Sequence, residues 1–454
     1  MKRDRKSKPN MLTGAPGKTL FFFAMPMILG NLFQQFYNMA DSVIVGRFVG
    51  EDALAAVGAS YALTTVFVML AIGGGTGSSV VTSQYLGAGK YREMRTSVFT
   101  ALISFLGVSI VLAALGLGFS ETILRALKTP DNILDAAGIY LKIYFAGLPF
   151  LFMYNVLAAM FNAMGDSRTP LYLLIFSSIL NVVLDIVFVT QFSMGVAGVA
   201  IATVMAQGIS AVISFTLLLQ KLKTYGDGEC QTNVYFDLQM LQKMIRVAIP
   251  TMLQQSIVSV GMLLVQSVVN GFGSSVLAGY TAGTRIESIC IVPMIAMGNA
   301  VSTFTAQNMG GEKTDRVKRG YHAAYGIIAC FAVLICVVLL TFKNQIIGVF
   351  MDENANQIAF ETGVSYLSFI AFFFIFIGMK AITDGVLRGS GDVVVFTAAN
   401  LINLTIRVVF ANLCAPVFGV AAVWYAVPLG WTANWGISFV RYLSGKWKEK
   451  KLIQ

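Results

Sequence analysis

The chain has 454 residues, of which 56% are hydrophobic and 12% are charged, and its formal net charge at pH 7 is +10. Average soluble domains carry roughly 25% charged residues, so this composition excludes an ordinary soluble protein. One histidine and five cysteines without paired spacing leave too few groups for a histidine-based zinc site, a Ser-His-Asp triad or a disulfide framework. We therefore expect neither an enzyme nor a protein with an organic cofactor.

Apolar runs of about 20 residues recur along the chain, and a helix needs that length to cross about 30 Å of hydrocarbon. We expect an all-α integral membrane protein whose twelve spans lie near residues 19–45, 53–80, 95–118, 138–160, 170–190, 194–219, 244–269, 276–303, 320–341, 359–386, 393–413 and 418–440. Most of the 32 Lys and Arg fall in the tails and in the even-numbered connections. This asymmetry predicts a protein of the plasma or inner membrane with both termini in the cytoplasm, near anionic lipid. It explains the net charge without nucleic acid.

Two sequence patterns occur twice, in the same order. QYLGAGKYREMR at 84–95 returns as QNMGGEKTDRVK at 307–318, and MGDSRTP at 164–170 is echoed by SGDVVVF at 390–396. Six spans in each half give both halves the same orientation, so we expect two six-helix lobes related by a pseudo-two-fold axis along the membrane normal. The expected domains are a basic tail at 1–18, an N-lobe at 19–220, a cytoplasmic linker at 221–242, a C-lobe at 243–441 and a second basic tail at 442–454.

The first span carries a polar stripe on an apolar helix. Polar residues recur there every three to four positions, at Asn31, Gln34, Gln35, Asn38, Asp41 and Ser42. An Asp in mid-membrane costs about 2.5–3.5 kcal/mol, so Asp41 is a candidate for proton or cation exchange. Tyr37 borders the stripe and can donate its hydroxyl to that carboxylate. Pro26, about four turns from Asp41, removes a backbone hydrogen bond and favours a bend, either a packing kink or a movable one.

The fifth span holds a second intramembrane acid. Asn181 and Asp185 are four residues apart, so they share one face of the helix. Two interpretations stay open for Asp185. It either takes part in ion coupling or, in its protonated form, makes a structural hydrogen bond to a neighbouring helix, for example to Asn38.

The second half differs, because its seventh span has no acid and Val265 takes the place that the repeat gives to Asp41. Its intramembrane charges are Arg285, Glu287, Lys380, Asp384 and Arg407. A lone buried charge is far costlier than a paired one, so we expect compensating ion pairs lining the second lobe; a second coupling site is the alternative. The expected residues of an adaptable substrate cavity are Gln34, Gln35, Gln255, Ser259, Met262 and Met294.

Residues 15–440 resemble the multidrug and toxic compound extrusion (MATE) family. The resemblance rests on a first-span pattern P-x(14)-D-x(4)-G-R-x-x-G, on the Q-x-x-G-x-x-K loop in both halves, on the MGD and LRGSGD turns after the fourth and tenth spans, and on the Asn181–Asp185 pair. The residues of the first-span pattern are Pro26, Asp41, Gly46, Arg47 and Gly50.

The resemblance implies a monomeric secondary antiporter that exports cationic or amphipathic compounds in exchange for H⁺ or Na⁺. It also implies that coupling, and any bound Na⁺, centres on Asp41, Asn181 and Asp185. The surrounding groups by the same resemblance are Tyr37, Asn38, Tyr140 and Thr203. The seventh span lacks the acid that one branch of the family carries, which puts a second-lobe Na⁺ site in doubt.

Two other functions fit the sequence less well than export, namely that of a flippase and that of an ion channel or receptor-like membrane protein. A lipid-linked oligosaccharide flippase of the same superfamily would need a basic cavity for pyrophosphate, whereas two acids mark the first lobe. An ion channel would conduct without exchange, and the duplicated, Gly-rich, Pro-bent halves argue against one.

Overall fold

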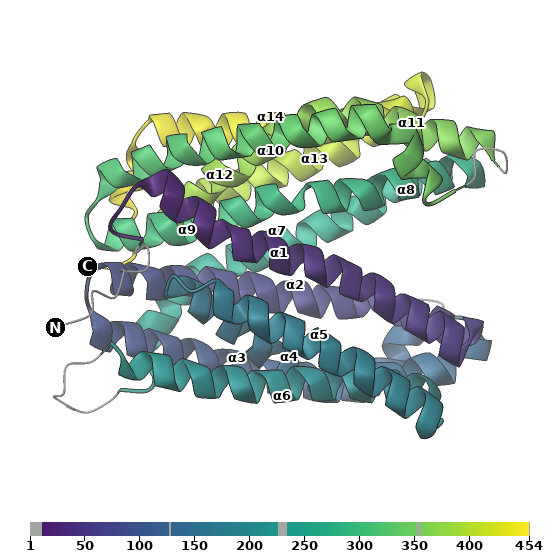
Figure 1. Cartoon of the computed structure of the whole chain (residues 1–454), viewed down its shortest axis with the longest axis horizontal. Helices are drawn as coiled ribbons and strands as arrows, with labels where there is room; N and C mark the ends of the chain where they lie inside the picture. Colours follow the sequence, from purple (N-terminus) through teal and green to yellow (C-terminus); the bar gives the residue numbers. More distant parts are fainter. Residues whose placement is uncertain (1–10, 127–128, 226–233, 352–355, 454) are drawn as a thin grey trace, which may run out of the picture. The chain divides into compact units, whose positions relative to one another are not determined.

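The computed structural model describes residues 11–126, 129–225, 234–351 and 356–453, and its described secondary structure is helical throughout (Figure 1). The first half of the chain forms α1 (Pro16–Ile44), α2 (Glu51–Gly87), α3 (Tyr91–Ala126), α4 (Asp131–Ala163), α5 (Arg168–Ile186) and α6 (Gly195–Lys223). The second half forms α7 (Leu238–Asn270), α8 (Ser274–Cys290), α9 (Val292–Gly310), α10 (Thr314–Gly348), α11 (Gln357–Ile370), α12 (Phe374–Ser390), α13 (Val393–Phe418) and α14 (Ala421–Leu443).

The all-α membrane fold is confirmed. In the described part of the chain, ten segments are long and apolar enough to cross a membrane, and two of them join consecutive helices, α8 with α9 and α11 with α12. The other two expected spans correspond to α7 and α14, which are helices of 33 and 23 residues.

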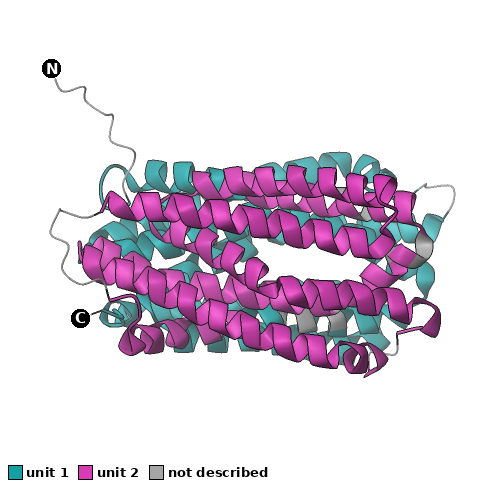
Figure 2. Cartoon of the chain, turned by 90° about the horizontal axis from the view of Figure 1, so that it is seen from below, with its two compact units in different colours: residues 1–28, 254–454 teal, residues 29–253 magenta. Residues whose placement is uncertain are grey.

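The chain divides into two compact units, shown in different colours in Figure 2. Unit 1 comprises residues 1–28 and 254–454, and unit 2 comprises residues 29–253. Our expected lobes assigned each helix to one lobe, whereas α1 and α7 each contribute residues to both units. The divisions fall two residues after Pro26 and three after Pro250, both inside helices. Proline removes one backbone hydrogen bond from a helix. α1 and α7 therefore each lack such a bond close to the residue at which the helix passes from one unit to the other.

In unit 2, α4 is the central helix and packs against α2, α3 and α6, while α5 packs on α6. The first part of α7 lies against α2, and two glycines of α2 permit that approach. A Cβ at Gly73 would lie only 2.8 Å from the Cα of Met252, and one at Gly77 would collide with the backbone of Ala248. α5 also contacts α4.

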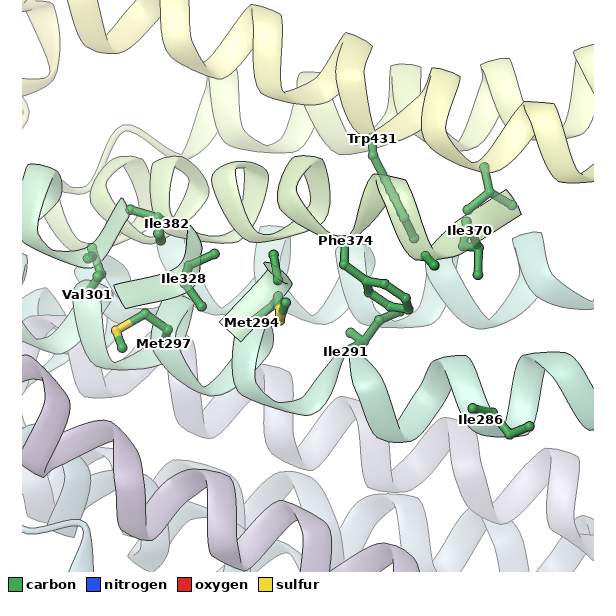
Figure 3. Close-up of a cluster of buried hydrophobic side chains, with 14 of the residues drawn as sticks. Ile286, Ile291, Met294, Met297, Val301, Ile328, Ile370, Phe374, Ile382 and Trp431 are labelled. Carbon is green, nitrogen blue, oxygen red and sulfur yellow. The ribbon is translucent and has the colours of Figure 1, made fainter. Parts of the chain in front are cut away.

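Unit 1 is built around α9 and α12, with α14 packed on α12 and α13, and α8 packed on α11. Its apolar core includes Met294, Met297, Ile328, Phe374 and Ile382 (Figure 3). Two glycines of α12, Gly385 and Gly389, let this helix approach α9 so closely that a Cβ at either position would collide with a backbone carbonyl of α9.

The repeated Gly-Asp turns form matching ion pairs. Asp166 follows α4 and its Oδ2 lies 2.5 Å from Nζ of Lys221 at the end of α6. Asp392 follows α12 and its Oδ2 lies 2.5 Å from Nε of Arg441 near the end of α14. Burial raises the pKa of Asp166, but the hydrogen bond and charge of Lys221, with two hydrogen bonds from Thr169, outweigh it and hold the pKa below its usual value.

The backbone before α1 is held by side chains of the loop between α9 and α10 and of the adjoining helices, all within unit 1. Arg316 donates from Nε to the Met11 carbonyl (3.1 Å), from Nη2 to Thr13 (2.6 Å) and from Nη1 to Gly14 (2.5 Å). Asn308 also donates to the Met11 carbonyl, at 3.0 Å, and Lys313 donates to Leu12 at 3.0 Å. We call residues 11–14 the strap.

Candidate functional site

Two carboxyl groups of unit 2 meet where their helices end. Asp41 lies in the last turn of α1 and Asp185 in the last turn of α5, and each helix continues into a π-helical turn, at Val45–Val49 and Val187–Gln191. The two carboxyl groups lie close enough to interact with each other. Each also has an Oδ1 atom that is buried and has no hydrogen-bond partner. Two neighbouring carboxyl groups in a medium of low dielectric constant favour a state in which they share one proton.

Asn181 connects this pair to its neighbours. It lies one helical turn before Asp185 and is only 2% exposed. With its amide nitrogen turned toward the acid, it donates to the Tyr37 hydroxyl and to Asp185 Oδ2, 3.3 Å away, and its carboxamide oxygen accepts from the backbone N–H of Thr203 at 3.0 Å. The amide therefore fixes the position of one carboxyl group.

The remaining expected site residues lie at different distances from the acids. Tyr140 on α4 interacts electrostatically with both Asp41 and Asp185, and its ring stacks on Tyr144 with centroids 6.5 Å apart. Asn38 is exposed and accepts a hydrogen bond from Gln34 Nε2 at 3.1 Å. The expected helix-bend residue, Pro26, lies inside α1.

A cavity of about 40 Å³ lies beside Asn181. It is lined by Gln34, Tyr37, Tyr154, Leu174, Ser177, Ser178, Asn181, Thr203, Ala206 and Gln207. A cavity of this size can hold a water molecule or a small cation. Sequence reasoning missed four of its polar residues. Ser177 and Ser178 lie four and three positions before Asn181, a spacing that could have revealed them, whereas Tyr154 and Gln207 carry no such signal.

In unit 1, the intramembrane acid Asp384 has a direct cationic partner. Lys380 Nζ lies 3.0 Å from Asp384 Oδ2, and the two side chains are 13% and 7% exposed. Asn400 accepts from Lys380 at 3.0 Å and donates to Asp384 at 3.2 Å. Ser438 donates to the other carboxylate oxygen at 2.8 Å. Both carboxylate oxygens of Asp384 therefore accept hydrogen bonds, and Lys380 donates two.

A second intramembrane acid of unit 1, Glu287, lies on α8 and is buried. The hydroxyl of Tyr366 donates a hydrogen bond to it, and Arg407 on α13 interacts with it electrostatically. Arg285 is exposed. Val265, at the place that corresponds to Asp41, is buried.

The expected substrate-cavity residues are dispersed. Gln34 lines the cavity in unit 2, and Gln35 and Gln255 are half-buried. Met294 is fully buried in the core of unit 1, where Figure 3 shows it between Met297 and Phe374. The side chains of Ser259 and Met262, and that of Ser42 in the first-span stripe, lie outside the part of the chain that the structure describes.

Comparison with known proteins gives one family. The MatE family model matches residues 26–187 and 250–413. The probable multidrug resistance protein YpnP of Bacillus subtilis is 32% identical over 444 residues, covering 96% of this chain and 97% of that protein. The probable multidrug resistance protein YoeA of the same organism is 27% identical over 467 residues, covering 99% and 97%. A solved outward-facing structure of a multidrug resistance MATE family transporter of the MOP superfamily has the same fold, with a TM-score of 0.87 at 24% identity over 96% of both chains.

Proposed function

Since this chain belongs to the MATE family of membrane transporters, we propose that it is a secondary active efflux antiporter, not driven by ATP, that exports cationic or amphipathic compounds in exchange for H⁺ or Na⁺. The observation that carries the proposal is the contact between Asp41 and Asp185 in the spanning region of unit 2. Relatives described as probable multidrug resistance proteins support the substrate class. We further propose a monomer in the plasma or inner membrane, with both termini in the cytoplasm.

Exchange follows from the chemistry of the carboxyl pair. Two like charges in contact in a medium of low dielectric constant repel strongly, so the pair is stable with one shared proton or with a cation between the two groups. A cation that enters must displace the proton, and a proton that enters must displace the cation. Asn181 keeps Asp185 in place in both states, and Tyr37 and Thr203 supply neutral hydrogen-bonding groups that tolerate either occupant.

Na⁺ is an alternative occupant to the proton. Hard cations prefer oxygen ligands, and the oxygens available here belong to the two carboxyl groups, the Asn181 carboxamide and the Thr203 and Tyr37 hydroxyls. In the described part of the chain, no three His, Cys, Asp or Glu residues form a group suited to a metal. The donor set therefore suits a weakly held, exchanging monovalent ion.

The energy available is sufficient. Each elementary charge that moves down a potential of ~100 mV releases about 2.3 kcal/mol, which corresponds to roughly a fifty-fold concentration ratio. A pH or Na⁺ gradient adds to this value.

The decisive experiment reconstitutes the purified protein in liposomes that contain no nucleotide and measures ethidium flux. An inward H⁺ gradient and an inward Na⁺ gradient are imposed separately. We expect one of them to drive ethidium out against its gradient, and ionophores that dissipate both to stop it. A strict requirement for ATP would overturn the antiporter proposal. Tight binding of a lipid-linked pyrophosphate, with no response to dyes, would favour the flippase alternative instead.

A further inference from the structure

A region of unit 1 corresponds in sequence to the region around Asp185 but carries a positive charge in place of the acid. Asn403 and Arg407 on α13 repeat the four-residue spacing that Asn181 and Asp185 have on α5. Tyr366 and Tyr140 also occupy matching positions. Tyr366 lies as many residues after the start of α11 at Gln357 as Tyr140 lies after the start of α4 at Asp131. As Tyr140 does with the two acids, Tyr366 interacts electrostatically with Arg407. The same arrangement therefore holds a guanidinium where unit 2 holds a carboxyl group.

The guanidinium of Arg407 has no acceptor. The side chain is half-buried, and its Nε is fully buried with no hydrogen-bond partner. Among the described residues, no hydrogen bond or ion pair of the structure includes Arg407. Glu287 contributes a negative field, but its carboxylate receives the hydroxyl of Tyr366. A guanidinium offers five N–H donors, and donors left without acceptors inside a membrane span are costly, so this arrangement calls for an acceptor that the described residues do not provide.

The surroundings of Arg407 favour an anionic group over more protein. The indole N–H of Trp424 is also buried without an acceptor, and the Trp424 ring contacts Tyr366 with centroids 5.9 Å apart. The carboxamide of Asn403 is buried, its oxygen has no hydrogen-bond partner, and among the described residues its amide nitrogen donates to no acceptor. Gly430 of α14 covers the other side, since a Cβ there would collide with Asn403 and would lie 2.8 Å from Cγ of Arg407.

We propose that Arg407 and Asn403 form a binding site for one small monovalent anion, either a halide ion or the carboxylate group of a small molecule. A guanidinium binds a carboxylate through two parallel hydrogen bonds, which supplies geometric specificity as well as charge. Glu287 limits the site to a single negative charge, because a second one would face its carboxylate. The site lies wholly in unit 1, and its existence does not depend on the ion exchanged in unit 2.

The test is isothermal titration of the purified full-length chain in detergent with sodium bromide and, separately, with sodium acetate, at an ionic strength held constant with sodium sulfate, whose two charges the site should exclude. Saturable binding of at least one anion with a stoichiometry near one is expected. Arg407→Gln should weaken it at least ten-fold. Arg407→Lys should weaken it less, because an ammonium keeps the charge but lacks the planar fork. Arg285→Gln, which removes an exposed arginine from the helix that carries Glu287, is the matched control and should leave binding unchanged.

A further variant keeps the test decisive if Arg407→Gln does not fold by gel filtration. Glu287→Gln removes the competing negative charge and should tighten binding several-fold, while Arg407→Lys still reports the loss of the fork. Binding of bromide alone identifies a halide site, and binding of acetate alone identifies a carboxylate site. The proposal is wrong if neither anion binds saturably to the wild type, or if neither Arg407→Lys nor Glu287→Gln changes the affinity.

Discussion

The carboxyl groups of the two units have different neighbours. In unit 2, Asp41 and Asp185 contact each other, and the groups around them are neutral amides and hydroxyls. In unit 1, Asp384 contacts Lys380, and Glu287 lies in the field of Arg407. A carboxyl pair without a fixed cation must take up a mobile one, whereas a carboxylate with a fixed cation has no such need.

The two halves of the chain thus differ in the charge that they carry at matching positions. Both halves keep an asparagine four residues before an ionisable group, at Asn181 and at Asn403. The ionisable group itself has changed sign, from Asp185 to Arg407, and the position that matches Asp41 has become the buried Val265. We infer that ion exchange is concentrated in unit 2, where mobile cations can replace the shared proton.

The largest expected effect is that of replacing Asp41, one of the two acids that distinguish unit 2 from unit 1. Asp41→Asn should abolish gradient-driven ethidium export, because the amide keeps the shape of the side chain but cannot exchange a proton. Asp185→Asn should weaken coupling in the same way. The measurement is dye efflux from proteoliposomes with an imposed inward gradient, on protein whose folding is verified by gel filtration.

The matched control for the acids is Glu121→Gln. Glu121 forms only an exposed pair with Arg125 on the surface of α3, at 2.9 Å, so its loss should leave export unchanged. Export at the wild-type rate by Asp41→Asn would show that Asp41 is structural, and the contrast between the units would then rest on Asp185 alone.

A smaller effect sharpens the comparison in unit 1. Asp384→Asn should destabilise the protein by about 3 kcal/mol, because it leaves the ammonium of Lys380 buried without its counter-charge. The double variant Lys380→Met with Asp384→Leu removes both charges and should lose less stability than the single one. Thermal unfolding in detergent measures both. Equal losses in the two variants would mean that the charge pair is not what stabilises this region.

Each unit has an ion pair at its Gly-Asp turn, and the smallest expected effect concerns the pair in unit 2, between Asp166 and Lys221. The pKa of Asp166 is lowered in the folded protein, so its pair with Lys221 contributes stability that is present above the unfolded value near pH 4 and is lost as pH falls through the lowered folded value. Asp166→Asn should therefore lower stability by about 1 kcal/mol at pH 7 and by progressively less at lower pH. A melting-temperature difference that does not change between pH 7 and pH 3 would contradict this assignment.

Sequence alone was sufficient for the all-α membrane fold because span length and hydrophobic runs are local properties. It could not show that α1 and α7 each contribute to two units, since that depends on which distant helices each part contacts. The prolines marked both places, but a proline in a sequence does not reveal which partner each half of its helix selects.

The candidate site divides along the same line. Asn181 and Asp185 share a helix, so their common face follows from spacing, whereas the contact between Asp41 and Asp185 joins two helices far apart in the sequence. Lys380 and Asp384 could be identified together because they, too, lie four residues apart on one helix. Tyr366, the hydrogen-bond donor to Glu287, was missed for the second, because nothing near residue 366 in the sequence points to α8.

The strap at residues 11–14 is recognised through its main-chain carbonyl groups. Those contacts do not depend on the side chains at Leu12 and Thr13, so a library of substitutions at these two positions should be well tolerated. Deleting Thr13 should not be, because it shifts every carbonyl before it out of reach of Arg316, Asn308 and Lys313. We therefore expect selection on this segment to preserve its number of residues more strictly than its side chains. Insertions and deletions should be removed, whereas substitutions should be tolerated.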